Sequence, residues 1–216
     1  YTDFEVIQIL VNPTFATQIT DNIEFTVTNK GTIGFNDYPD NNQGIGFKLS
    51  NSSNLLFEGG LLFGTSSSKV VDCLRGTNPD VANSDLSNVL PFILSVPGLF
   101  ADVQGHMVIN DDNAGSNKIG TQITLDTYTF NETGLDYSAI FRYVFKNTSG
   151  SDISDFYAGL FFDWDIDEST SGNNTAYYDT EFKCAIFSHP TLNYYIGMGL
   201  GWRWGSDNFY AITNDG

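Results

Sequence analysis

The sequence predicts an all-β protein, built as a large antiparallel β-sandwich with long connecting loops. Short runs in which apolar and polar residues alternate are typical of half-buried strands. Aromatic residues are abundant, with 18 Phe, 11 Tyr and 3 Trp, and turns rich in Asn, Ser and Gly separate the runs. At 216 residues and 41% hydrophobic content, the chain can bury one sizeable core. Since neither a repeat nor a linker divides it, we expect residues 1–216 to form a single domain.

The first predicted strand lies in residues 4–10, where Phe4, Val6 and Leu10 fall on one face before Asn12-Pro13 interrupts the pattern. A strand of this kind can leave its own sheet and pair with the open edge of another copy. We therefore interpret residues 1–12 as a candidate exchangeable terminal strand that would join copies into a homo-oligomer or fibre. The alternative is an ordinary edge strand within one subunit.

The following strands are expected at residues 23–28, 32–35, 44–49 and 55–64. The last of these is apolar on both faces, which indicates a central strand, and Gly59-Gly60 indicates a bulge or kink within it. Residues 75–105 are the least regular part of the chain, and we expect them to form a long excursion across the sandwich.

Regular strands return in the second half of the chain, at residues 118–130, 138–146, 157–162, 180–188, 194–201 and 209–213. The clearest pattern is in 138–146, where Ala139, Phe141, Tyr143 and Phe145 share one face. Ile140, Arg142 and Val144 fall on the opposite face.

The net charge of the chain limits the classes of molecule that it is expected to bind. Nine basic and 26 acidic residues give a net charge of −17, which disfavours binding to nucleic-acid phosphates or to anionic membranes. No apolar run approaches the roughly 20 residues that span a bilayer. We therefore expect neither nucleic-acid binding nor membrane insertion, and cations are the natural small partners.

An acidic segment follows the apolar strand 157–162 and predicts a metal site. Asp163, Asp165 and Asp167 stand at alternate positions, and Asp179 could return as a distal ligand. Such carboxylates suit an oxygen-ligated Ca²⁺ if the chain curls into a loop, and the alternative is a solvated acidic loop. Residues 110–117 are a second, weaker calcium candidate, for which the alternative is an ordinary turn rich in Asx residues.

Several runs together carry a family resemblance: residues 31–35, 44–47, 56–64, 70–76, 145–150, 157–166 and 177–179. They resemble a non-catalytic β region found downstream of the protease domain in secreted bacterial subtilisin-like serine peptidases and in related cell-surface proteins. The resemblance implies an extracellular or cell-surface location and a structural, adhesive or assembly role. In that family, Gly usually follows Asp-Trp-Asp-Ile, whereas Asp167-Glu168 follows here and adds ligand capacity.

Catalysis is not expected. Ser66 lies in a Gly-Thr-Ser segment similar to that of subtilisin-like nucleophiles, but no helical pattern follows it. His106 and His189 lack the sequence context of a catalytic base. Glu58 could pair with Asp163 or Asp165 as in a glycosidase, but its simpler interpretation is an ion pair with Arg75 or Arg142.

Aromatic residues support an alternative function, a carbohydrate-binding accessory domain of an exported hydrolase. The platform for polysaccharide would comprise Trp202, Trp204, Tyr177 and Tyr194, although packing within the protein is the competing interpretation. The two cysteines, Cys73 and Cys184, are either bridged in an oxidising compartment or buried as free thiols.

Overall fold

The computed structural model describes residues 14–37, 40–75, 81–192, 195–202 and 210–211. Within these ranges the chain forms strands and short 3₁₀ helices, with no α-helix, and every strand pairing is antiparallel. The predicted all-β class is therefore confirmed. The strand predicted at residues 4–10, and with it the exchangeable segment 1–12, lies outside the described residues.

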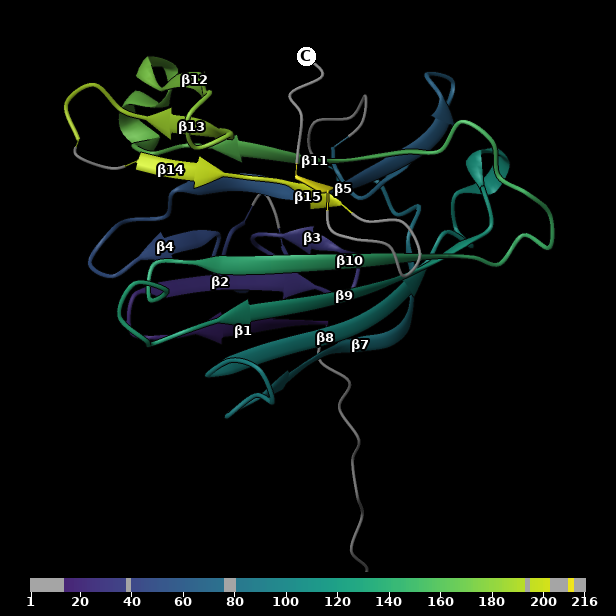
Figure 1. Ribbon diagram of the computed structural model, residues 1–216, viewed down its shortest axis with the longest axis horizontal. Coiled ribbons are helices and arrows are strands. Elements are labelled where there is room, and N and C mark those ends of the chain that lie inside the picture. The colour runs from purple at the N-terminus through teal and green to yellow at the C-terminus, as the bar shows by residue number, and fades with distance from the viewer. Residues whose placement is uncertain (1–13, 38–39, 76–80, 193–194, 203–209, 212–216) are drawn as a thin grey trace, which may run out of the picture.

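One layer of the sandwich is a seven-stranded sheet with the order β1-β2-β3-β5-β11, in which β4 pairs with β2 and β6 pairs with β5 (Figure 1). Its strands are β1 (Phe15–Ile19), β2 (Ile23–Thr28), β3 (Thr32–Ile33), β4 (Phe47–Leu49), β5 (Leu56–Ser66), β6 (Lys69–Asp72) and β11 (Tyr157–Trp164). As predicted, β5 is central, because β3, β6 and β11 all pair with it.

The other layer is a four-stranded sheet with the order β10-β9-β8-β7, which crosses the lower part of the view in Figure 1. Its strands are β7 (Ser87–Ser95), β8 (Val103–Asn110), β9 (Thr121–Thr129) and β10 (Ala139–Asn147). The expected irregular excursion at residues 75–105 is wrong, since β7 and the start of β8 lie there. Pro91 and register shifts at Asn88/Leu90 and Leu90/Ile93 break the alternation of β7, which concealed the strand.

Aromatic side chains from the two layers meet in the core. The rings of Phe25 and Phe141 lie 5.0 Å apart, and those of Phe63 and Phe145 lie 5.5 Å apart. The face of β10 that carries Ala139, Phe141, Tyr143 and Phe145 therefore packs into the core. In β8, Gly105 is required because a Cβ atom there would lie 2.2 Å from the ring of Phe92, which fills that space.

A three-stranded sheet packs beside the sandwich at the upper left of Figure 1. It comprises β12 (Thr175–Asp179), β13 (Cys184–Ser188) and β14 (Tyr195–Met198). Trp164 joins it to the core, since its indole N–H donates to Met198 Sδ at 3.2 Å and its ring lies 6.4 Å from that of Phe187. The remaining elements are β15 (Gly201–Trp202), β16 (Tyr210–Ala211) and the 3₁₀ helices η1 (Gly115–Asn117) and η2 (Glu168–Asn173). No helix in the described ranges is long and apolar enough to span a membrane.

Both cysteines are free thiols in the structure, so the bridged alternative is not observed. Cys73 is fully buried in the core, where its thiol lies 3.7 Å from the Leu61 carbonyl oxygen, and this burial raises its pKa to about 12. Cys184 belongs to β13 of the separate three-stranded sheet. The two residues therefore belong to different layers of the molecule.

Candidate functional site

The first predicted metal ligand, Asp163, lies directly opposite Glu58 where β11 pairs with β5. Glu58 forms an ion pair with Arg75, whose Nε lies 3.4 Å from the Glu58 carboxylate, and the Arg75 guanidinium stacks 4.0 Å above the ring of Phe57. Burial raises the pKa of Glu58, Arg75 lowers it, and the nearby Asp163 carboxylate raises it again. The ion pair with Arg75, predicted as the simpler interpretation of Glu58, is confirmed.

Beyond β11 the chain turns away as expected, but hydrogen bonds within the loop occupy the Asp167 carboxylate. Asp167 accepts hydrogen bonds from the Ser169 hydroxyl at 2.9 Å, from the Ser169 N–H at 3.2 Å and from the Thr170 hydroxyl. The bonds from Thr170 and Ser169 hold the pKa of Asp167 below its ordinary value. The Thr170 hydroxyl also contacts Nε2 of the buried His189 at 3.0 Å, which ties η2 to the end of β13.

Asp179, the proposed distal ligand, closes the turn between β12 and β13. Its carboxylate accepts the backbone N–H groups of Glu181 and Phe182, both at 2.9 Å. Within the described part of the chain, no three Asp, Glu, His or Cys side chains gather as a metal-binding group. Asp163, Asp165, Asp167 and Asp179 are therefore not arranged as a ligand set here. Calcium binding stays a prediction, and it would require the loop to rearrange.

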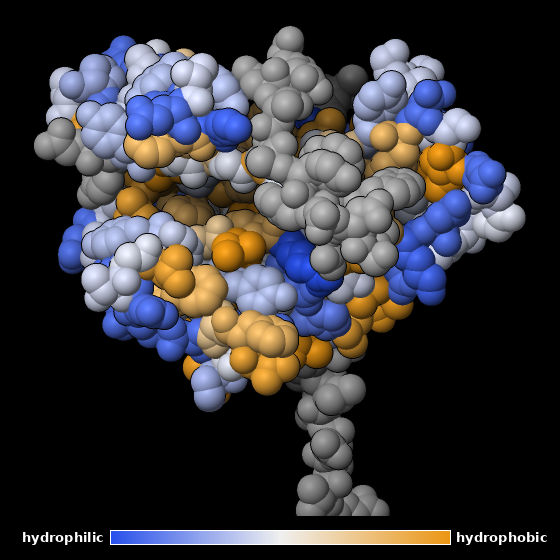
Figure 2. Space-filling model, in the orientation of Figure 1, coloured by the Kyte–Doolittle hydropathy of each residue, from blue (hydrophilic) through white to orange (hydrophobic). Residues whose placement is uncertain are grey.

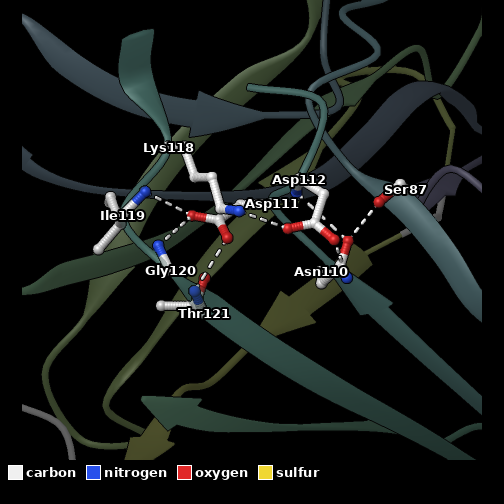
Figure 3. A network of polar contacts seen from close by, with 8 residues as sticks. All are labelled: Ser87, Asn110, Asp111, Asp112, Lys118, Ile119, Gly120 and Thr121. Atoms are coloured by element: carbon white, nitrogen blue, oxygen red, sulfur yellow. Dashed lines mark hydrogen bonds and ion pairs between the residues drawn. The ribbon is translucent and has the colours of Figure 1, made fainter. Parts of the chain in front are cut away.

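The second acidic loop is a structural turn (Figure 3). Asp111 is only 1% exposed, and its carboxylate accepts the backbone N–H groups of Ile119 at 2.6 Å, Gly120 at 2.9 Å and Thr121 at 2.9 Å. Beside it, the Asp112 backbone N–H donates to Asn110 Oδ1 at 3.2 Å, and Lys118 Nζ lies 2.7 Å from the Asp112 carboxylate. The alternative of an Asx-rich turn is confirmed for this loop.

Ser66 and the two histidines, the residues considered for a catalytic triad, lie in different parts of the fold. Ser66 ends β5, and its hydroxyl lies 3.2 Å from that of Ser68 in the tight turn to β6. His106 Nδ1 lies 2.7 Å from Asp126, on the four-stranded sheet, whereas His189 hydrogen-bonds with Thr170 and Thr191. Each of these side chains thus makes its hydrogen bonds in a different part of the fold.

A row of charged residues crosses the outer face of the four-stranded sheet, and the sequence did not reveal it. Asp126 on β9 is 6% exposed and lies between Arg142 on β10 and His106 on β8, each at 2.7 Å. The strand register places these three side chains opposite one another. The sequence holds no local signal for the strand register that brings these three residues together. Figure 2 shows hydrophilic surface mixed with apolar surface over this sheet.

The turn that follows β7 exposes three large apolar side chains. Val96, Leu99 and Phe100 are 71%, 81% and 71% exposed. We call this segment, residues 96–100, the apolar turn. Exposed apolar side chains that adjoin one another form the kind of surface that marks interaction sites.

The carbohydrate-binding residues predicted from sequence are only partly described. Tyr177 on β12 is 52% exposed, Trp202 lies in β15, and Trp204 and Tyr194 are outside the described residues. The neighbouring Tyr195 on β14 is 65% exposed. Because Tyr177 opposes Ile186 and Tyr195 opposes Ser188, both tyrosines lie on the same face of the three-stranded sheet.

Comparison of the chain with protein-family models, curated proteins and solved structures finds no match. The resemblance to the non-catalytic region of subtilisin-like peptidases therefore stays a prediction.

Proposed function

We propose that this chain is a non-catalytic β module of the cell surface or extracellular space, with a structural, adhesive or assembly role. The apolar turn is the observation that carries the proposal. Its side chains are more than two-thirds exposed, so a contact that removes them from water gains free energy at about 25 cal/mol per Å². Such a surface suits binding to a protein partner, and we propose a second copy as that partner.

Two features support a binding role over catalysis. Asp126, which contacts His106, also pairs with Arg142, and Glu58 pairs with Arg75. These carboxylates contribute to ion pairs within the fold. We therefore expect casein, peptide esters and common polysaccharides to be left intact, and turnover that disappears in Ser66→Ala or Glu58→Gln would contradict this.

The test of the assembly role compares the full chain with a Leu99→Ser/Phe100→Ser variant by sedimentation velocity over a wide concentration range. The variant should keep the wild-type melting temperature, because both side chains are exposed, and should associate at least tenfold more weakly. Phe182→Ser is the matched control, since Phe182 is 74% exposed in the turn between β12 and β13. A wild-type chain that stays monomeric at high concentration would overturn the proposal.

A second candidate, carbohydrate binding, is favoured by the tyrosine pair on the three-stranded sheet. Tyr177 and Tyr195 share the outer face, whereas Phe187 on the inner face packs toward Trp164. Aromatic rings exposed on a flat sheet can stack against sugar rings. Polysaccharide pull-down should then fall in Tyr177→Ala/Tyr195→Ala but not in the control Tyr157→Ala, a residue that is 68% exposed on β11. Equal retention of all three proteins would exclude this candidate.

A further inference from the structure

The longest regular open edge in the described structure belongs to β10. All nine of its residues pair with β9 without a register shift, and the strand contains neither proline nor glycine. No described strand pairs with its other side. Such an edge presents unpaired backbone N–H and C=O groups, which can accept a further strand.

Other edges of the described sheets are shorter or interrupted. β7 contains Pro91 and two register shifts, and the N–H of Phe92 already donates to Asn29 Oδ1 at 2.8 Å. β1 has five residues, and the pairing of β11 shifts between Asp163 and Trp164. The remaining edge strands have five residues or fewer, so among the described strands β10 offers the longest uninterrupted set of backbone groups.

We propose that β10 accepts residues 2–11 of a second copy as an added strand, which extends the four-stranded sheet between molecules. The inference rests on the proposed assembly role, and it names the donor segment and the acceptor edge. Main-chain hydrogen bonds would supply the affinity in such strand addition, and side chains on alternate positions would supply the selectivity.

Charge favours this pair of segments. The outer face of β10 carries Lys146, and also Arg142, which already forms an ion pair with Asp126 on β9. Residues 1–13 contain Asp3 and Glu5 and no basic residue, and in an extended chain these two acids share a face. Two copies that each carry a net charge of −17 repel one another, so a local match of opposite charges would help to select this contact.

Geometry favours a donor from another copy. The Thr14 carbonyl accepts the N–H of Asn29 at 2.8 Å, and Asn29 in turn binds the β7 residue Phe92, so residue 14 lies on the β7 side of the sandwich. Three strand spacings of 4.7–4.9 Å separate β7 from β10, about 14 Å in total. The three Cα–Cα steps from Val11 to Thr14 span at most about 11 Å. Residues 2–11 of the same copy could not lie along the whole of β10.

The test uses full-length chains and two readouts. Sedimentation measures association of the wild type, of Lys146→Glu, and of a charge-swapped Asp3→Lys/Glu5→Lys/Lys146→Glu variant. Lys183→Glu, in the turn between β12 and β13, is the control with the same change in charge. Hydrogen exchange then compares the backbone amides of residues 139–147 in dilute and concentrated wild-type protein.

We expect Lys146→Glu to weaken association about tenfold, because it replaces attraction to the donor acids by repulsion. The charge swap should restore association, Lys183→Glu should match the wild type, and association should protect residues 139–147. Protection of another edge instead, or equal association of Lys146→Glu and Lys183→Glu, would overturn the inference. If association still depended on Leu99 and Phe100, the proposed function would survive that result, whereas a monomeric wild type would overturn both.

Discussion

Two acidic loops of this chain look alike in sequence and differ in structure. Asp111 follows β8 and is buried, with three backbone N–H groups directed at its carboxylate. The acids that follow Phe162 are distributed along an exposed strand end and a loop, and Asp167 receives its bonds mainly from neighbouring hydroxyl groups. The number of acids therefore says little about the role of such a loop, and the supply of backbone donors says much more.

The difference has an electrostatic basis. A buried carboxylate is stable only when its lost hydration is replaced, and three N–H groups accomplish this for Asp111. Near the end of β11 the carboxylates are exposed or half-buried, so they keep part of their hydration and need fewer hydrogen bonds from the protein. The first loop should therefore matter for folding, and the second is where an added cation could still act.

The largest expected effect is from Asp111→Ala, which leaves three buried N–H groups without their acceptor. We expect it to lower the free energy of unfolding by about 3 kcal/mol. Denaturant unfolding of the variant and the wild type measures the difference. Asp112→Ala removes an exposed acid from the same loop and serves as the control. If the two variants were equally stable, the structural role of Asp111 would be wrong.

A smaller effect is expected from calcium. If Ca²⁺ binds Asp163, Asp165 and Asp167 in the native state alone, a free Ca²⁺ concentration of 100 times the Kd adds about 2.7 kcal/mol to the free energy of unfolding. Excess chelator should then lower the melting temperature, and Asp163→Asn/Asp167→Asn should remove the response. An identical melting curve with calcium and with chelator would end the calcium prediction and widen the contrast between the two loops.

The smallest effect concerns the pH dependence of the exposed loop. Hydrogen bonds from Thr170 and Ser169 lower the pKa of Asp167 in the folded state. Its contribution to stability is therefore complete above the pKa of the unfolded chain, and is lost as pH falls through the lower folded pKa. Thr170→Val should reduce stability at neutral pH more than at pH 2, as measured by urea unfolding at each pH. Equal losses at both pH values would show that the carboxylate is not involved.

Sequence periodicity predicted the elements in which one face is buried and the other exposed. The strand β10 follows this rule, since every second side chain from Ile140 to Lys146 is exposed. The central strand β5 was predicted from a different signal, its run of apolar residues on both faces. β7 was missed because its bulges shift the alternation and because it exposes Val89, Leu90 and Ile93. Alternation of apolar and polar residues reveals the buried face of a strand only where no bulge shifts the strand's register.

The sites were harder to predict than the strands. The ion pair of Glu58 with Arg75 was anticipated as one of two possibilities, because few basic residues are present to pair with it. The contact of Asp126 with Arg142 and His106 depends on the register of three strands, which the sequence does not encode in any local pattern. Whether Asp111 faced inward likewise depended on residues 119–121 folding back onto it.

Gln18 has a further consequence for how the two layers are held in alignment. This side chain of β1 is fully buried, donates to the Val103 carbonyl at 3.0 Å and to the Thr129 hydroxyl at 2.8 Å, and accepts from the Thr127 hydroxyl. Apolar contacts tolerate sliding of one sheet over the other, whereas these bonds form at only one offset. Gln18 thus fixes the position of one sheet relative to the other, because at any other offset its buried amide would lack hydrogen-bond partners.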